Sequence, residues 1–118
     1  QDFVQSFIDR SAFAQQITQH IGNAMEVIPQ LNESWDLVFI DADKENYLNY
    51  YNLIMPTLKS GSYILADNIL WSGKVVDKSA LDKDTNLLRA FNKQITEDNR
   101  IENILLPIRD GIQIGRVI

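Results

Sequence analysis

The sequence predicts an α/β fold, a mostly parallel sheet with helices on both faces that ends in an antiparallel hairpin. Helical and strand-like apolar patterns alternate along the chain, which is typical of parallel strands joined by crossover helices. Apolar runs at 35–40, continuous apart from Asp36, and within 60–68 indicate strands that are buried on both faces. Asp110-Gly111 separates two apolar segments near the C-terminus, which is a strong hairpin signal. Residues 1–118 therefore form a single domain, or part of one.

The N-terminal part of the chain predicts two helices with a strand between them. Apolar residues at i,i+4 spacing indicate an amphipathic helix over about 2–10. The segment 15–22 predicts a short strand that ends at a glycine. The segment 23–31 predicts a short helix, with Asn23 as its N-cap.

Beyond residue 34 the patterns predict a strand, a helix, a strand, a loop, a helix and two further strands. Pro56 should end or kink the first of these helices, because proline lacks the backbone N–H and clashes with the preceding turn. The ranges, in order, are 35–40, 44–58, 60–68, 69–84, 85–98, 101–108 and 112–118.

The composition argues against several classes of protein. The net charge is −5 and the basic residues are scattered singly, which disfavours binding to nucleic acid. The chain has no cysteine, which excludes disulfides and thiolate metal sites, and we expect a cytoplasmic protein. No apolar run approaches the ~20 residues that a membrane span needs, and the N-terminus lacks the pattern of a secretory signal.

Polar residues of one kind follow both of the predicted buried strands. The first strand runs into the sequence DADK, which begins at Asp41, and the second runs into Asp67-Asn68. Ligands of open α/β sheets bind outside the carboxyl ends of the strands, and neighbouring ends lie roughly 5 Å apart. If the two strands are neighbours, Asp41, Asp67 and Asn68 converge. Oxygen donors without His or Cys favour a hard divalent cation, Mg²⁺ first and Ca²⁺ or Mn²⁺ as alternatives.

Lys44 is a candidate general base beside these oxygens. It follows Asp41 by three residues, so its amine can return to the same point from the first turn of the next helix. A nearby cation disfavours the ammonium form and lowers the pKa of the lysine. In a purely structural alternative, Asp41 and Asp43 cap the helix. Asp67 and Asn68 then form a turn, since Asp and Asn favour caps and turns generally.

The stretch WDLVFIDADKENYLNYYNLIMPTLKSGSYILADNILWSGKVV resembles the cation-dependent, S-adenosylmethionine-dependent O-methyltransferases, which include caffeoyl-CoA and catechol O-methyltransferases. The bacterial caffeoyl-CoA type is the nearer match, and the resemblance extends from IGNAMEVIP to LPIRDGIQIGRVI. It implies a partial Rossmann-like class I methyltransferase sheet. It also implies methyl transfer from S-adenosylmethionine to a hydroxyl of a small catechol-like or phenolic acceptor, with a bound metal assisting.

The resemblance also implies roles for single residues at the metal. Asp41, Asp67 and Asn68 match the metal ligands of that family. Lys44 matches the lysine that takes the proton from the acceptor hydroxyl, so Lys44 and Asp41 would be the catalytic residues.

Further positions match the binding sites of the two substrates. Ala24, Asp41 and Asp43 correspond to residues at the methyl donor. Trp71 and Ser72 correspond to the segment that lines the acceptor pocket.

Two parts of that family's donor site have no counterpart within residues 1–118: a glycine-rich loop after the first strand and an acid at the end of the second. We therefore expect the C-terminal part of a methyltransferase domain, cut from something longer, since the chain also begins without Met. Alone it should bind S-adenosylmethionine poorly and turn over little. The strand at 35–40 would lack one neighbour, and its exposed edge should favour a homodimer or a higher oligomer.

Other residues are given structural roles. Tyr47, Tyr50 and Tyr51 recur at helical spacing, which indicates core residues, and Asp110-Gly111 is assigned turn chemistry alone. The alternative to an enzyme is a non-catalytic, Mg²⁺-binding doubly wound module, because strand-end aspartates hold Mg²⁺ in such domains too.

Overall fold

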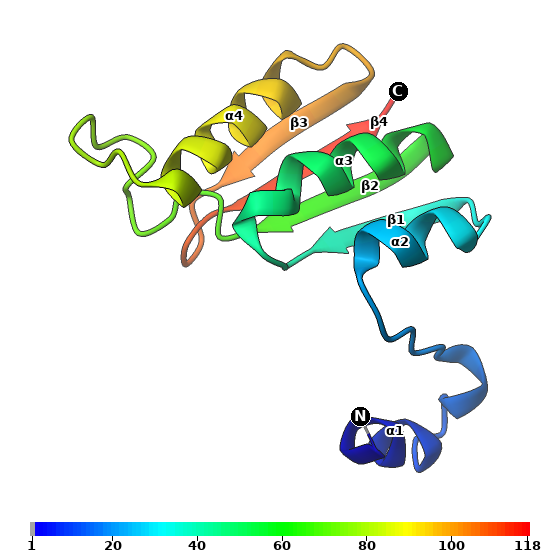
Figure 1. The fold of residues 1–118 in the computed structure, drawn as a ribbon. Coiled ribbons are helices and arrows are strands. Elements are labelled where there is room, and N and C mark those ends of the chain that lie inside the picture. Colours follow the sequence, from blue (N-terminus) through cyan, green and yellow to red (C-terminus); the bar gives the residue numbers. More distant parts are fainter. Residues whose placement is uncertain (1) are drawn as a thin grey trace. The chain divides into compact units, whose positions relative to one another are not determined.

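The computed structural model describes residues 2–118. The chain divides into two compact units, one that ends at Leu31 and one that spans Asn32–Ile118. The larger unit contains the whole sheet (Figure 1). The prediction that 1–118 forms a single domain stays a prediction.

The N-terminal unit is built from short helices. They are α1 (Asp2–Asp9), η1 (Ala14–Gln16), α2 (Ala24–Val27) and η2 (Ile28–Gln30). The predicted helices and the N-cap are confirmed, because the Asn23 side chain accepts a hydrogen bond from the backbone N–H of Met25 at 3.1 Å.

The strand predicted at 15–22 is wrong. Gln15 and Gln16 lie in the 3₁₀ helix η1, and residues 17–22 form no strand. Ile17 does have extended backbone. Extended backbone becomes a strand only beside a hydrogen-bonded neighbour, and residues 2–31, the part of this unit that the structure describes, contain no strand.

The larger unit contains every element that the sequence predicts beyond residue 34. The predicted helix at 44–58 is divided into a 3₁₀ turn, an α-helix and a second 3₁₀ turn that contains Pro56, as expected for a residue without an N–H. The elements are β1 (Trp35–Ile40), η3 (Lys44–Asn46), α3 (Tyr47–Ile54), η4 (Met55–Thr57), β2 (Leu58–Asp67), α4 (Lys83–Glu97), β3 (Ile101–Leu106) and β4 (Ile112–Val117).

The sheet has the strand order β1-β2-β4-β3. β1 and β2 pair in parallel, whereas β4 is antiparallel to both β2 and β3. The α/β class and the C-terminal hairpin are thus confirmed, with parallel pairing among the described strands confined to β1 and β2. β1 lies at one edge of the sheet, as expected for a strand that lacks one neighbour.

The two faces of the sheet differ in their cover. In Figure 1, α3 and α4 lie side by side on one face, which we call the covered face. Its strand residues Ile64 and Ala66 are fully buried. The opposite side, here called the open face, carries the exposed apolar side chains of Leu37, Phe39, Tyr63 and Ile104.

Helices were expected on both faces, but within residues 32–118 they cover one. Leu37 and Phe39 on the open face are 58% and 53% exposed. The apolar sequence of β1 predicted a strand buried on both faces. Within residues 32–118 this prediction is wrong, because helices cover only one face of β1.

A partly buried ionic cluster joins α3 to the end of α4. The Tyr51 hydroxyl donates to Asp98 Oδ2 at 2.8 Å, and the Arg100 guanidinium donates to the same carboxylate at 2.6 Å. The hydrogen bonds from Arg100 hold the pKa of Asp98 well below its usual range, and Tyr51 adds to this. Asp98 is therefore ionised at neutral pH and fixes the two helices to each other.

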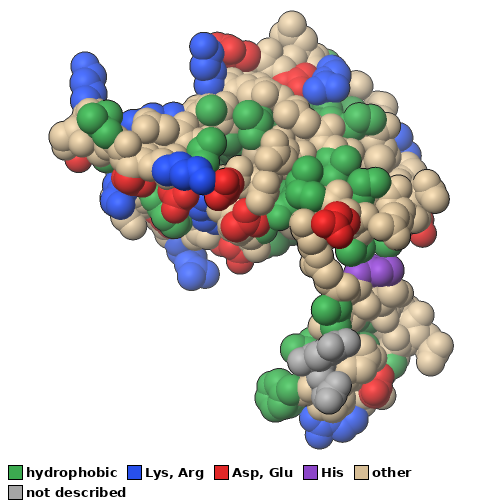
Figure 2. Space-filling view, viewed as in Figure 1, with side chains coloured by type: hydrophobic (Ala, Val, Ile, Leu, Met, Phe, Trp, Pro, Cys, Tyr) green, Lys and Arg blue, Asp and Glu red, His purple; other side chains and the backbone are tan. Residues whose placement is uncertain are grey.

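The surface agrees with the charge pattern of the sequence. On the face shown in Figure 2, Lys and Arg side chains are scattered and do not form one basic patch. Among the helices that the structure describes, none has the length and apolar character needed to cross a membrane.

Candidate functional site

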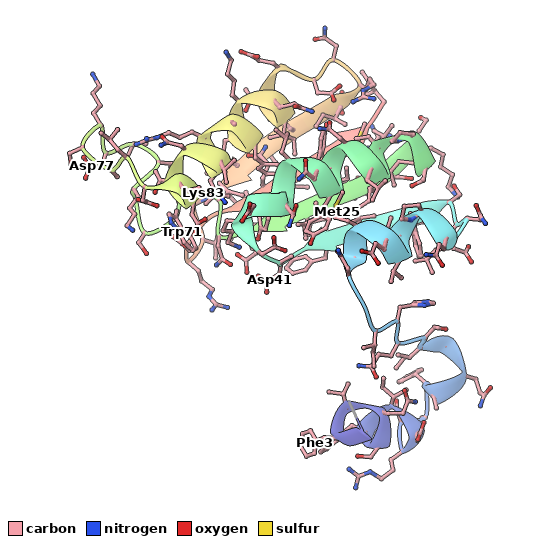
Figure 3. The ribbon with its side chains drawn as sticks, in the orientation of Figure 1. Phe3, Met25, Asp41, Trp71, Asp77 and Lys83 are labelled. Atoms are coloured by element: carbon pink, nitrogen blue, oxygen red, sulfur yellow. The ribbon has the colours of Figure 1, made fainter. Side chains whose placement is uncertain are left out.

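The carboxyl ends of β1 and β2 lie next to each other where the strands of the sheet finish, and we call this end of the sheet the edge. Ile40 pairs with Ala66, so the next residue of each strand, Asp41 or Asp67, continues from neighbouring positions. Figure 3 shows Asp41 at the end of β1 and Trp71 in the loop that follows β2, both at this edge. The expectation that the two strands are neighbours is confirmed.

The amine of Lys44 is the centre of the contacts at this edge. Lys44 Nζ donates to the hydroxyl of Tyr47 and, over a longer 3.4 Å, to Asn68 Oδ1. It also lies 5.8 Å from the ring centroid of Trp71, within range of a cation–π interaction. The structure thus brings Lys44 together with Asn68 and Trp71, which lie more than 20 residues further along the chain.

The surroundings of Lys44 act on its pKa in opposite directions. Partial burial is the largest influence and lowers the pKa of the amine below its usual value. The carboxylates of Asp41 and Asp67 lie close enough to oppose that shift by stabilising the ammonium form. The net shift is downward, toward the neutral form that a base requires.

Tyr47 fixes this arrangement from α3. Its hydroxyl accepts from Lys44 and donates to the backbone carbonyl of Asp67 at 2.8 Å, so it links the helix to the end of β2. Burial raises the pKa of the Tyr47 hydroxyl to about 12, which keeps it protonated and able to donate.

The chain turns sharply where β2 ends. Asn68 has φ 59°, in the left-handed region that Asn tolerates better than most residues, and its N–H donates to Asp67 Oδ1 at 2.7 Å. This turn places the Asn68 amide oxygen beside Lys44.

The donor set at this edge suits a hard divalent cation. Asp41, Asp67 and Asn68 offer carboxylate and amide oxygens, the ligands that Mg²⁺, Mn²⁺ and Ca²⁺ prefer. Within residues 2–118, no group of three or more His, Cys, Asp or Glu side chains is arranged to hold a metal. Asp41, Asp67 and Asn68 offer two carboxylates and one amide, so they fit a cation by the chemistry of their oxygens.

Asp43 is held on the α3 side of the site. Its Oδ1 accepts from the Tyr50 hydroxyl at 2.8 Å, and its Oδ2 accepts from the Asn46 side chain. The hydrogen bond from Tyr50 is the main cause of its lowered pKa. Asp43 is therefore an ordered carboxylate at this edge of the sheet.

Trp71 and Ser72 lie in the loop between β2 and α4, which we call the site loop (residues 68–82). Both have left-handed backbone, with φ of 51° and 54°. The Asp110 carboxylate, from the turn between β3 and β4, accepts the N–H of Ser72. A distant turn thus holds the segment that was predicted to line an acceptor pocket.

Arg89 of α4 holds the distal half of the site loop. Its guanidinium donates to the backbone carbonyls of Lys74, Val75, Asp77 and Ala80 at 2.6–3.0 Å. A single side chain thereby satisfies much of the loop backbone, so the loop is ordered without regular secondary structure.

Ala24 belongs to the N-terminal unit, where it is the first residue of α2. The remaining predicted site residues all lie in the larger unit. They are Asp41, Asp43, Lys44, Asp67, Asn68, Trp71 and Ser72.

The sequence analysis missed three residues at this edge. Tyr47 and Tyr50 are buried as predicted, yet their hydroxyls bind Lys44 and Asp43. The i,i+3 spacing of Tyr47 from Lys44 was a usable signal, because it places both on one helix face. Asp110 gave no comparable signal, since its contact with Ser72 spans 38 residues.

Comparison with known proteins gives a consistent result. The sequence profile of a family described as O-methyltransferase matches residues 1–118. Caffeoyl-CoA O-methyltransferase 1 of Nicotiana tabacum is 38% identical over 123 residues, covering 94% of this chain and 52% of that protein. Caffeoyl-CoA O-methyltransferase 1 of Eucalyptus globulus is also 38% identical, covering 94% of this chain and 50% of that protein.

A solved structure matches the fold. The O-methyltransferase from Bacillus cereus in complex with SAH aligns with a TM-score of 0.88 at 25% identity, covering 99% of this chain and 57% of its own chain. The chain described here thus spans about half the length of the proteins that it matches.

Proposed function

This chain belongs to the O-methyltransferase family, and we propose that it carries the metal and acceptor sites of an S-adenosylmethionine-dependent O-methyltransferase. The acceptor would be a small catechol-like or phenolic hydroxyl compound. The observation that carries the proposal is the position of the Lys44 amine. It contacts Asn68 and faces the Trp71 ring, at the edge where two aspartates end neighbouring strands.

Two bound groups complete the chemistry. When bound, S-adenosylmethionine supplies the methyl group, and a divalent cation supplies positive charge that favours the ionised acceptor oxygen. Asp41, Asp67 and Asn68 would hold the cation, with Mg²⁺ as our first expectation and Ca²⁺ or Mn²⁺ as alternatives. Ala24, Asp41 and Asp43 would contact the methyl donor.

The residues of this chain would handle the proton and position the acceptor. Lys44 Nζ would accept the proton of the attacking hydroxyl, and its partial burial favours the neutral form that this step needs. Tyr47 and Asn68 hold that amine in place. Trp71 would stack on a planar aromatic acceptor, and with Ser72 it would form the pocket wall.

Replacing Lys44 tests the proposal. In the complete gene product with S-adenosylmethionine, MgCl₂ and catechol, Lys44→Ala should lower kcat by about 10²–10⁴-fold, the usual contribution of a general base. Lys83→Ala is the matched control, because Lys83 is an exposed lysine whose ion pair is with Glu45 at 2.7 Å. Methylated product is measured by mass spectrometry.

The outcomes separate the two functional readings. A Lys44→Ala enzyme that keeps its turnover would contradict the proposed base. A wild-type protein that binds Mg²⁺ but methylates none of a panel of catechols would favour the non-catalytic module.

The 118-residue chain by itself should bind S-adenosylmethionine weakly and show little turnover, because its glycines form no glycine-rich strand-to-helix turn. Micromolar affinity in isothermal titration calorimetry would contradict this. We also expect a homodimer or a higher oligomer, since β1 is an edge strand beside an apolar open face. A cytoplasmic location stays a prediction from the cysteine-free sequence.

A further inference from the structure

The segment that carries Trp71 has an unusual backbone. Trp71 and Ser72 are consecutive residues with left-handed φ, a conformation that is sterically disfavoured for residues with a Cβ. Such a pair persists only where neighbouring groups hold it in place.

Asp110 supplies contacts on both sides of Trp71. Its Oδ1 accepts the N–H of Ser72, and its backbone carbonyl accepts the N–H of Leu70 at 2.9 Å. The next residue of the turn extends the contact, because the Gly111 carbonyl accepts the N–H of Ile69 at 3.2 Å. The turn between β3 and β4 therefore binds the residues that flank Trp71.

The turn and the loop also interlock sterically. Gly111 is buried with φ 81°, and a Cβ at this position would lie 2.5 Å from Leu70 Cγ. The Leu70 side chain thus occupies the space that any larger residue at position 111 would need. This close approach explains why the turn presents glycine directly after Asp110.

We propose that Asp110 is a positioning residue, which fixes the Trp71 indole over Lys44 and thereby sets the affinity for the aromatic acceptor. The inference rests on the proposed function. The indole centroid lies 5.8 Å from Lys44 Nζ, so a change in the backbone at Trp71 displaces the wall of the proposed acceptor site.

The effect of Asp110 should be local to its end of the site loop. Arg89 independently holds the carbonyls of Lys74, Val75, Asp77 and Ala80. Removing the Asp110 carboxylate would therefore free the Ser72 N–H and loosen the backbone at Trp71, while the backbone carbonyls of the turn still bind Leu70 and Ile69 and the distal part of the loop stays ordered.

Fluorescence tests the positioning directly. Trp35→Phe leaves Trp71 as the one tryptophan of the 118-residue chain. In that background, Asp110→Ala should shift the emission of Trp71 and increase its quenching by acrylamide. Asp110→Asn keeps a side-chain oxygen that can accept the Ser72 N–H, so it should restore the emission.

Asp77→Ala is the matched control for fluorescence. Asp77 accepts hydrogen bonds from Ser79 in the distal part of the site loop, and its loss removes the same charge. The control should leave Trp71 unchanged. Unchanged Trp71 emission in Asp110→Ala would overturn the proposal, as would an equal change in the control.

Kinetics test the link to the acceptor. In the complete gene product, Asp110→Ala should raise the KM for catechol about tenfold, the loss expected for one hydrogen bond to a charged group. The kcat should change less than the KM, since Lys44 keeps its own hydrogen bonds and the charges of Asp41 and Asp67 although it loses that of Asp110, and Asp110→Asn should recover the KM. A displaced Trp71 with unchanged KM would overturn the role in acceptor binding. A wild-type protein that methylates no catechol would instead reject the proposed function, and the fluorescence would still decide whether Asp110 positions Trp71.

Discussion

The covered and open faces of the sheet are made by the same strands from similar apolar residues, yet their environments differ. On the covered face, Ile64 and Ala66 of β2 are fully buried under α3 and α4. On the open face, Leu37 and Phe39 of β1 leave more than half of their side chains in solvent. Apolar surface stabilises a fold in proportion to the area removed from water. The two faces therefore contribute very differently to the stability of this chain.

Two phenylalanines give the sharpest test of this difference. Phe91 of α4 is fully buried, with its ring 5.5 Å from that of Tyr47 and 6.1 Å from that of Tyr51, whereas Phe39 is 53% exposed. Phe91→Ala should lower the free energy of unfolding by about 3–5 kcal/mol, because it leaves a cavity. Phe39→Ala should lower it by less than about 1 kcal/mol, since little area is lost from a packed interior.

Urea denaturation of the 118-residue chain measures both variants. If Phe91→Ala does not fold, Phe91→Leu keeps most of the volume and should still lose more stability than Phe39→Leu. Equal losses at the two positions would show that the open face is buried in solution.

The ionic cluster of Tyr51, Asp98 and Arg100 should have the next largest effect on the free energy of unfolding. Asp98→Asn should lower the free energy of unfolding by about 1–3 kcal/mol, because it weakens charge-assisted hydrogen bonds from Arg100 and Tyr51. The folded pKa of Asp98 lies below its unfolded value, so its stabilisation is present above the unfolded pKa. That stabilisation is lost as the pH falls from the ordinary aspartate range toward the lower folded pKa.

The pH dependence of urea unfolding between pH 6 and 3 checks the sign. The wild-type chain should lose stability more steeply with falling pH than Asp98→Asn. Asp36→Asn is the control for the loss of one negative charge, because Asp36 is 83% exposed and lies outside this cluster. A shallower slope for wild type than for Asp98→Asn would contradict the assignment.

Features that depend on residues close in the sequence could be predicted from the sequence alone. Local signals were sufficient for the elements beyond residue 34, for the Asn23 cap and for the Asp110-Gly111 turn, because neighbouring residues create them. They also placed Asp41 and Asp67 at strand ends, whereas the pairing of these two strands was a condition of the prediction that the structure confirms.

What failed depended on partners distant in the sequence. The segment 15–22 has strand-like residues, but the described residues of its unit include no strand to pair with. The run of β1 is apolar on both sides, but its pattern does not reveal which side this chain's own helices cover. The contact of Asp110 with Ser72 likewise appears only once the hairpin is folded back on the site loop.

The open face should affect association more than folding. Phe39→Lys places a charge among Leu37, Tyr63 and their apolar neighbours, and it should weaken self-association by at least about tenfold, or ~1.4 kcal/mol. Its urea midpoint should stay near that of the wild type. Multi-angle light scattering across a dilution series provides the measurement, and a wild-type chain that is monomeric at all concentrations would exclude the expected oligomer.

The smallest effect is expected at an ion pair whose distance is close to that of the Arg100–Asp98 pair but whose carboxylate is exposed. Lys59 Nζ lies 2.7 Å from Asp36, close to the 2.6 Å between Arg100 and Asp98. The two cations are similarly exposed, but the Asp36 side chain is 83% exposed whereas that of Asp98 is 9% exposed. Water and salt screen exposed charges, and ordering two mobile side chains opposes the attraction. Lys59→Ala should therefore change the free energy of unfolding by less than about 0.5 kcal/mol, and 1 M NaCl should remove the difference. A loss comparable to that of Asp98→Asn would mean that distance, rather than burial, decides the strength of these pairs, and would undermine the contrast between solvent-exposed and covered parts of the sheet.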